Sequence, residues 1–308
     1  MAGRNGKQKW SRKTKIGIGI AGLLFLAVSA CFRLMHRTGP IEGIFSWTEE
    51  AWAEEEREHF LSIASEAGAG EIYQEFSDEA LAAGQPEGFI RDLAAEGIQV
   101  YLLCGSPEWG YERDGASLCG KIRTVAAYNQ SHSGGKIQGI MADVEPYLLP
   151  EWESGGQSRV KLMETWLEGM KTAYQQAKEQ ELALIVCIPN FYDETSPDIS
   201  NALIEEGCDA AAVMNYNRRD EYGQIEEEAA LAARYGKKIL CVYELQKAGS
   251  HGLTEANTYA SEGMDALFAS MRKLEKAFAD TDPKADLTFA VHYYEPLKEM
   301  IEEQRAEK

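Results

Sequence analysis

Short apolar runs alternate with longer amphipathic stretches throughout residues 41–308. The runs are rich in Ile, Val, Leu, Tyr and Phe and are bounded by Gly, Pro or polar residues, a pattern typical of buried β-strands. The stretches between them carry apolar residues three and four positions apart, a pattern typical of helices with one face against a core. Eight runs can be distinguished, at 41–47, 71–77, 98–105, 136–145, 182–190, 209–217, 237–245 and 287–295.

Eight alternations of strand and helix in one chain predict a (β/α)8 barrel, the TIM barrel. The first strand need not be followed by an ordinary helix. The third connection, 106–135, is rich in Gly, Ser and Tyr, and we expect a long loop with a short helix there. The charged tail 298–308 is interpreted as a solvated helix end.

The residues before the barrel predict an export segment. Residues 1–15 are basic, residues 16–32 are uncharged and mostly apolar, and residues 33–40 are expected to link this segment to the barrel at 41–308. The segment 16–32 fits an uncleaved signal anchor, a cleaved signal peptide or a lipoprotein signal in which "VSAC" would place a lipid on Cys31. Each alternative places the barrel on the exterior, as on a bacterial cell surface, because positive charge before an apolar segment favours the cytoplasm, and the anchor or the lipid would hold it at the cell membrane.

Charge and cysteine content narrow the classes of partner. Residues 41–308 contain all 50 acidic residues of the chain, so nucleic acid is not an expected partner. Five cysteines follow Cys31 without a C-x-x-C spacing, and we interpret them mainly as small buried side chains, with a Cys104–Cys119 disulfide as the alternative. We expect neither a bound metal nor a cofactor, and the sequence leaves the oligomeric state open.

Polar and aromatic residues gather where the predicted strands end. The active sites of such barrels lie at the C-terminal ends of the strands. Aromatic rings beside carboxylates and amides suit a sugar-binding cleft, since sugars offer apolar faces and hydroxyl groups. We expect Tyr73, Tyr243 and Tyr293 to be packing residues. Glu75 fits a solvated strand end as well as it fits a site residue. The other candidates are Trp47, Asp143, Glu145, Tyr147, Asn190, Tyr192, Tyr216, Asn217, Glu244, His292 and Tyr294.

The stretch "GIMADVEPY" (139–147) ends the fourth predicted strand. Side chains alternate between the two faces of a strand, so Met141, Asp143 and Glu145 are expected on one face, and Ala142 and Val144 on the other. Two carboxylates then share one small space, and crowding in a partly apolar barrel mouth is expected to raise a carboxyl pKa.

Two of these strands resemble motifs of glycoside hydrolase family 18, the chitinases and endo-N-acetylglucosaminidases. "QGIMADVE" (138–145) resembles the D-G-x-D-x-D-x-E strand of that family, and "MNYN" (214–217) resembles its M-x-Y-[DN]. The resemblance implies that Glu145 is the general acid and that Asp143 orients the acetamido group of the substrate. It also implies that Tyr216 and Asn217 hold that acetamido group while it attacks the anomeric carbon, so that the sugar supplies its own nucleophile.

The sequence departs from the family pattern at three positions. Gln138 stands where the family has its first Asp, and Met141 stands in place of the middle Asp, the carboxylate that shares a proton with its neighbours. The Trp that is usual on strand eight aligns with Tyr294 or with nothing.

The preferred hypothesis is an exported, membrane-anchored glycoside hydrolase acting on an N-acetylhexosamine-containing or related polysaccharide. A second hypothesis is a retaining glycosidase with Glu145 as acid/base and Glu244 as nucleophile, which requires the two carboxyls about 5 Å apart. A metal-dependent hydrolase that uses His292 with Asp143 and Glu145 is a third. The fourth is a glycan-binding barrel without catalysis.

Overall fold

The computed structural model describes residues 39–282 and 284–307. The predicted export segment, including Cys31, lies outside these residues. Gly39–Lys308 forms one compact unit. None of the helices that the structure describes combines the length and apolar character that crossing a membrane requires.

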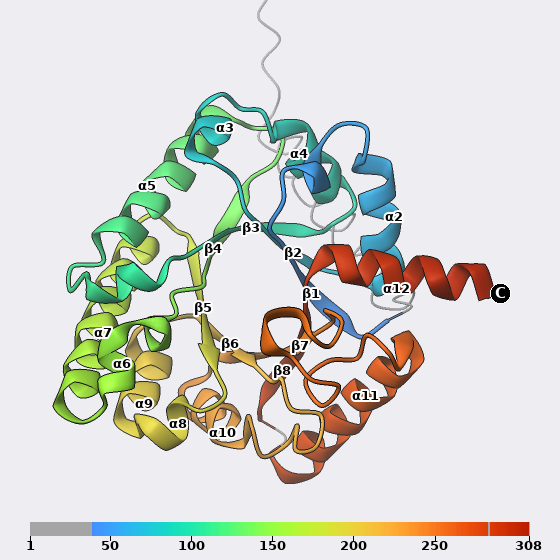
Figure 1. Ribbon diagram of the computed structural model, residues 1–308. Helices are drawn as coiled ribbons and strands as arrows, with labels where there is room; N and C mark the ends of the chain where they lie inside the picture. Colours follow the sequence, from blue (N-terminus) through green and yellow to red (C-terminus); the bar gives the residue numbers. More distant parts are fainter. Residues whose placement is uncertain (1–38, 283, 308) are drawn as a thin grey trace, which may run out of the picture. The chain divides into compact units, whose positions relative to one another are not determined.

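Eight parallel strands close into a barrel in which each strand pairs with its neighbours in sequence, and β1 pairs with β8 (Figure 1). All eight predicted strands are confirmed, with ends shifted by a few residues. The strands are β1 (Ile41–Ser46), β2 (Glu71–Gln74), β3 (Gln99–Cys104), β4 (Ile137–Ala142), β5 (Ala183–Pro189), β6 (Ala210–Met214), β7 (Lys238–Glu244) and β8 (Asp286–His292).

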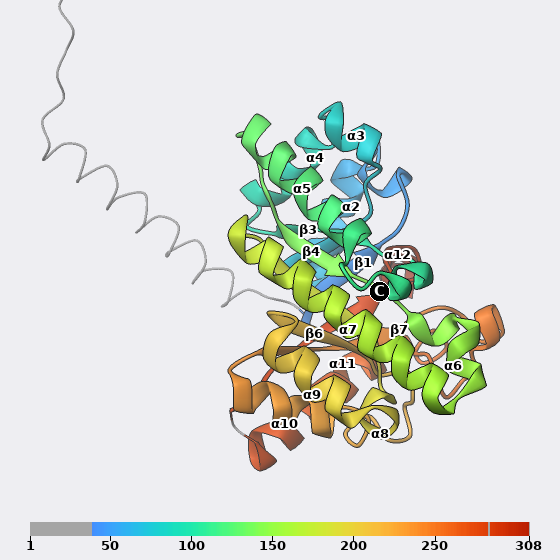
Figure 2. The ribbon, with the colours of Figure 1, turned by 90° about the vertical axis from the view of Figure 1, so that its left-hand side faces the viewer.

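Helices surround the barrel on its outside, as the two perpendicular views show (Figures 1 and 2). The α-helices are α2 (Arg57–Ala67), α3 (Asp78–Ala82), α4 (Glu87–Ala95), α5 (Ala116–Ser131), α6 (Pro150–Ser154), α7 (Gly156–Glu179), α8 (Tyr192–Thr195), α9 (Pro197–Glu206), α10 (Glu226–Tyr235), α11 (Gly263–Thr281) and α12 (Tyr294–Glu307). Short 3-10 helices are η1 (Glu50–Trp52), η2 (Pro107–Tyr111), η3 (Pro146–Leu148) and η4 (Ser250–Gly252).

The connection between β3 and β4 differs from the expected loop with a short helix. It contains η2 and the 16-residue helix α5. The Gly and Ser content of this stretch concealed an apolar face, on which Leu118, Ile122 and Val125 are buried against the core. The C-terminal tail is helical as expected, but Met300 and Ile301 of α12 are buried, so this helix covers the core as well as facing solvent.

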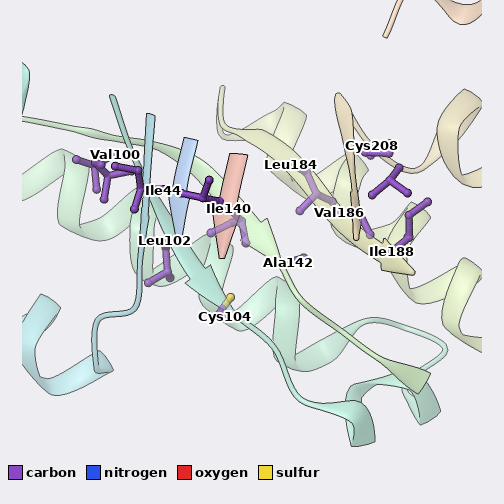
Figure 3. Close-up of a cluster of buried hydrophobic side chains, with 14 of the residues drawn as sticks. Ile44, Val100, Leu102, Cys104, Ile140, Ala142, Leu184, Val186, Ile188 and Cys208 are labelled. Atoms are coloured by element: carbon purple, nitrogen blue, oxygen red, sulfur yellow. The ribbon is translucent and has the colours of Figure 1, made fainter. Parts of the chain in front are cut away.

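Side chains from the strands build two separate hydrophobic clusters. One lies between the strands and the helices and includes Ile140 and Ala142 of β4 (Figure 3). The other fills the barrel and includes Met141. Cys104, Cys119, Cys187, Cys208 and Cys241 are buried and free, so their interpretation as small core residues is confirmed and the Cys104–Cys119 disulfide is wrong.

Tyr73 and Tyr243 were expected to be packing residues, and both are buried. Tyr73 lies inside the barrel and donates a hydrogen bond of 2.5 Å to Glu71, whose other oxygen accepts one of 2.9 Å from Lys238. Tyr243 packs in the outer cluster. Tyr293 is half-buried and packs against the barrel interior.

The barrel interior tolerates no added atom where β4 meets β5. Gly139 pairs with Ala183, and a Cβ at Gly139 would lie 2.1 Å from the Ala183 carbonyl oxygen. We predict that Gly139→Ala lowers the free energy of unfolding by about 2 kcal/mol, because the two strands must separate. Gly120→Ala in α5 is the matched control, since its Cβ would meet only the end of the Arg123 side chain at 3.8 Å.

The control should raise the free energy of unfolding by about 1 kcal/mol, because alanine favours a helix. Urea unfolding followed by circular dichroism measures both changes. Equal effects of the two substitutions would contradict the packing of β4 on β5.

Candidate active site

The alternation expected for "GIMADVEPY" is observed at Met141, Ala142 and Val144. Met141 lies in the cluster inside the barrel, and Ala142 and Val144 lie in the cluster outside it. Asp143 directly follows the last residue of β4, and its N–H donates to the Cys104 carbonyl at 2.9 Å, which extends the pairing with β3. Asp143 therefore continues the inward face of β4 at the carboxyl end of the barrel.

Gly105 permits this placement, although it was not among the predicted site residues. A Cβ at Gly105 would lie only 1.8 Å from the backbone oxygen of Asp143. A residue with a side chain would therefore push the Asp143 backbone away from β3. A glycine directly after a strand was the available signal, since glycine marks a close approach of two backbones.

The carboxyl of Asp143 is enclosed. Its Oδ1 is buried and has no hydrogen-bond partner among the residues that the structure describes. Burial is the largest cause that raises the pKa of Asp143 to about 7, and the neighbouring Glu145 raises it further, while His292 and Cys187 act in the opposite direction. The expected crowding of the two carboxyls therefore contributes, but desolvation contributes more. Cys187, which the sequence analysis placed only in the core, belongs to the surroundings of Asp143.

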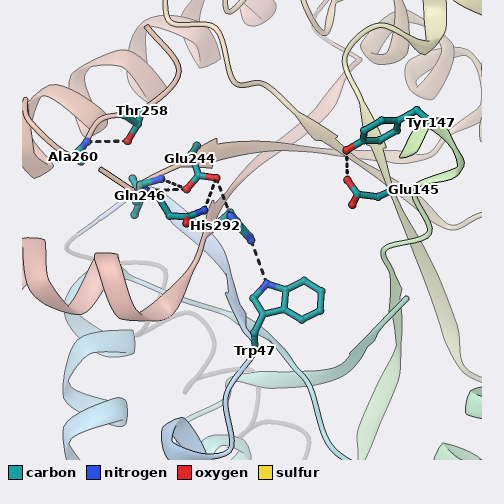
Figure 4. Close-up of polar contacts among 9 residues, drawn as sticks. Trp47, Glu145, Tyr147, Glu244, Gln246, Thr258, Ala260 and His292 are labelled. Carbon is teal, nitrogen blue, oxygen red and sulfur yellow. Dashed lines mark hydrogen bonds and ion pairs between the residues drawn. The ribbon is translucent and has the colours of Figure 1, made fainter. Parts of the chain in front are cut away.

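Glu145 is held by Tyr147. The two are joined by a hydrogen bond from the Tyr147 hydroxyl to Oε1 of Glu145 (Figure 4). Burial and the Glu145 carboxylate raise the pKa of Tyr147, so its hydroxyl remains a donor. The Tyr147 ring packs against the rings of Phe191 and Trp152, at centroid distances of 5.4 and 6.4 Å. Tyr147 thus fixes Oε1, and Oε2 has no partner within the described parts of the chain.

Glu244 lies in a different environment. It is 3% exposed, yet its carboxylate accepts hydrogen bonds from the N–H groups of Leu245 (2.9 Å) and Gln246 (2.8 Å) and from the Gln246 side chain (3.3 Å). Nδ1 of His292 lies 2.9 Å from Oε2 of Glu244, and Nε1 of Trp47 donates to Nε2 of His292 at 3.2 Å (Figure 4). Glu244, His292 and Trp47 therefore form one hydrogen-bonded chain across the ends of β7, β8 and β1.

Tyr216 lies at the same end of the barrel. Its ring centroid is 6.4 Å from that of His292, and it packs on the inner cluster. Burial, and next the charge of Glu244, raise the pKa of Tyr216 well above its usual value, so it is a neutral hydrogen-bond donor. The side chain of Asn217 accepts from the N–H of Arg219 at 3.2 Å, within its own loop.

Three other candidates make contacts away from the barrel interior. Tyr192 is 1% exposed in the outer core, with its ring 5.6 Å from that of Trp166. Tyr294 is 3% exposed, and its ring packs against Phe60 with the centroids 4.4 Å apart and the planes tilted by 31°. Asn190 donates a hydrogen bond to Gln224.

The expectation of sugar contacts for Tyr192 and Tyr294 is not supported, because both rings are covered by the core. Each begins a helix, α8 or α12, and each ring packs in the outer cluster, away from the barrel axis.

The metal-site hypothesis finds no support in the geometry. Both ring nitrogens of His292 are engaged, one by Glu244 and the other by Trp47. Within residues 39–282 and 284–307, no group of three or more His, Cys, Asp or Glu side chains is placed to hold a metal ion.

Comparison with known proteins identifies the fold. No protein-family model matches the chain, and no curated protein matches it by sequence. Among solved structures, a chitinase from Chromobacterium violaceum ATCC 12472 is similar with a TM-score of 0.50 and 11% identity, over 87% of this chain and 100% of that one. A GH18 chitinase from Pseudoalteromonas aurantia is similar with a TM-score of 0.52 and 10% identity, over 85% of this chain and 99% of that one. The remote resemblance to glycoside hydrolase family 18 is therefore confirmed at the level of the fold, an eight-stranded parallel barrel.

Proposed function

We propose that the protein is a glycoside hydrolase that cleaves an N-acetylhexosamine-containing polysaccharide, with Glu145 as the general acid. The observation that carries this proposal is the pair Asp143 and Glu145 at the carboxyl end of β4, one carboxyl enclosed and the other held at a single oxygen. The likeness of the barrel to chitinases supports the same substrate class.

Each residue of the site has a role that its contacts allow. The Tyr147 hydroxyl donates to Oε1 of Glu145. Oε2 is therefore the oxygen that carries the proton for the glycosidic oxygen. In the complex the N–H of the substrate acetamido group donates to Asp143 and so favours its ionised form, which leaves the proton of the acid pair on Glu145, and Tyr216 donates to the acetamido carbonyl oxygen. That carbonyl oxygen attacks the anomeric carbon while the bond from this carbon to the leaving oxygen breaks. The leaving oxygen takes the proton of Glu145. Glu145 then removes a proton from the water that opens the cyclic intermediate.

The environment of Glu244 favours this mechanism over a retaining one in which Glu244 is the nucleophile. Two backbone N–H groups, the Gln246 amide and His292 share its two oxygens. Such hydrogen bonds lower the nucleophilicity of a carboxylate and fix its orientation. For Glu244 to attack the anomeric carbon of the substrate, several of these hydrogen bonds would have to be lost.

A glycan-binding barrel without catalysis is the second candidate, and Met141 favours it. This side chain is fully buried in the inner cluster at the position where the related motif has a carboxylate. Asp143 therefore has no acidic neighbour at position 141 with which to share a proton. Turnover measurements distinguish the two candidates.

We also propose that the chain is exported and anchored in the membrane through residues 16–32, with the barrel on the exterior. The support is the basic and apolar sequence of residues 1–32 and the acidic character of the barrel. Protease accessibility of the barrel on intact cells tests this placement, and protection from the protease would contradict it.

Glu145→Gln is predicted to lower kcat by a factor of about 10² to 10⁴, because glutamine has nearly the same shape but cannot donate an acidic proton. Glu153→Gln is the matched control, since Glu153 is an exposed acid of α6. The assay is release of a fluorophore from aryl glycosides of N-acetylglucosaminyl oligomers, with glucosyl oligomers in parallel.

Retained turnover in Glu145→Gln would contradict its role. Turnover of the plain glucosides, together with loss of activity in Glu244→Gln, would instead support the retaining mechanism. Binding of oligosaccharide without turnover would support the glycan-binding barrel.

The Asp143 carboxyl is predicted to titrate near pH 7 in the unliganded protein, because burial and Glu145 both disfavour its charge. Glu145→Gln should lower this midpoint and leave it above the usual value for aspartate, since burial, the larger cause, remains. Carbon NMR of Asp-labelled protein measures the titration, and Asp143→Asn identifies the signal by its loss.

This shift also has a consequence for stability. The folded protein keeps a proton on Asp143 between about pH 4 and about pH 7, whereas the unfolded chain loses it near pH 4. The contribution of Asp143 to the free energy of unfolding therefore decreases as the pH rises through this window. Asp143→Asn should remove that part of the pH dependence, and an unchanged pH dependence would argue against an enclosed carboxyl.

A further inference from the structure

The hydrogen-bonded chain Glu244–His292–Trp47 selects one tautomer of the neutral histidine. An indole N–H can only donate, so Nε2 of His292 must be the acceptor in the 3.2 Å bond to Trp47. The proton of a neutral imidazole then lies on Nδ1 and is donated to Glu244 at 2.9 Å. Since Glu244 is itself held by the N–H groups of Leu245 and Gln246, these hydrogen bonds connect the backbone directly after β7 to the indole ring.

The indole is held by its edge. The rings of Trp47 and His292 meet at 75° with their centroids 6.5 Å apart, so His292 does not cover the ring faces. Trp47 is half-buried and packs on the inner cluster at the end of β1. Figure 4 shows it well apart from Glu145, and the two residues follow strands that are three positions apart in the barrel.

The same histidine is close to the acid pair. His292 is near enough to Asp143 to oppose the rise of its pKa, and its ring centroid lies 6.4 Å from that of Tyr216. Trp47 therefore borders the space that Asp143 and Tyr216 also face. A fixed aromatic face beside hydrogen-bonding groups is suited to a sugar ring.

We propose that Trp47 is the stacking platform for a sugar ring at this barrel mouth, and that Glu244 and His292 are positioning residues that act on the substrate through Trp47. The inference rests on the proposed function for the identity of the ligand, and on the hydrogen-bonded chain for the positioning. Glu244 then has a role that requires it to be buried and fully hydrogen-bonded, in contrast to a nucleophile.

The first experiment tests the positioning without any ligand. In the full chain labelled with ¹⁵N-tryptophan, Trp47→Phe identifies the Nε1–H signal of Trp47 among six tryptophans. His292→Leu should shift this signal toward the position of a water-exposed indole. His292→Gln supplies an acceptor oxygen and should restore part of the shift.

His59→Gln is the matched control, because His59 pairs with Glu302 at 3.0 Å between α2 and α12. It should leave the Trp47 signal unchanged. An unshifted signal in His292→Leu would overturn the positioning role.

The second experiment measures binding of N-acetylglucosamine oligosaccharides by calorimetry in the Glu145→Gln background. Trp47→Ala should weaken binding about tenfold or more, and Trp47→Phe and His292→Leu should each weaken it about fivefold. The double variant Trp47→Phe with His292→Leu should bind no more weakly than either single variant. The reason is that phenylalanine already lacks the N–H group that His292 accepts.

Additive losses in the double variant would overturn the inference that His292 acts through Trp47. In the active protein, His292→Leu should raise KM more than it lowers kcat, and the reverse would indicate a direct role in the reaction. If the Glu145→Gln protein binds no acetamido sugar, the proposed function and the stacking role of Trp47 both fail. The NMR experiment still decides whether Glu244 and His292 hold the indole ring.

Discussion

A closed parallel barrel accepts only every second side chain of each strand into its interior, and this constraint determines which residues meet at its mouth. In β4 it sends Met141 and then Asp143 inward, while Ala142 and Val144 pack against the helices. Gly105 allows the backbone of Asp143 to approach β3 so closely that the alternation continues past the end of the regular strand. The position of the enclosed carboxyl is thus a consequence of backbone geometry.

Two buried carboxyls in this barrel have opposite properties because they have different partners. Glu244 accepts four hydrogen bonds, and these compensate for the loss of water around its charge. Asp143 has one oxygen with no partner in the described chain, and burial raises its pKa to about 7. A carboxyl with such a pKa can change its protonation during a reaction, whereas a carboxylate with four donors is better suited to hold a neighbour in place.

Departures from the related motif change the surroundings of the acid pair. Met141 replaces a carboxylate by an apolar side chain, and Cys187 lies beside Asp143 from β5. The mouth also has its tryptophan on β1 instead of β8. Because β1 pairs with β8 in the closed barrel, an aromatic ring from either strand borders the same space.

The amino-acid sequence predicted the fold and the acid pair, because periodicities of two and of three to four residues are local properties that can be read along the chain. It also determined that Tyr73 and Tyr243 are packing residues. It did not reveal α5, whose apolar face is spread among Gly and Ser residues.

Which strand-end aromatic residues face the barrel mouth depends on contacts between distant parts of the folded chain. Tyr192 and Tyr294 begin helices that pack their rings into the outer core, whereas Trp47 is held in the mouth by a histidine 245 positions away in the sequence. Contacts of that separation depend on barrel closure, which no local pattern encodes. For the same physical reason, only the folded chain distinguishes Glu244, with four donors, from Asp143, whose carboxyl is enclosed.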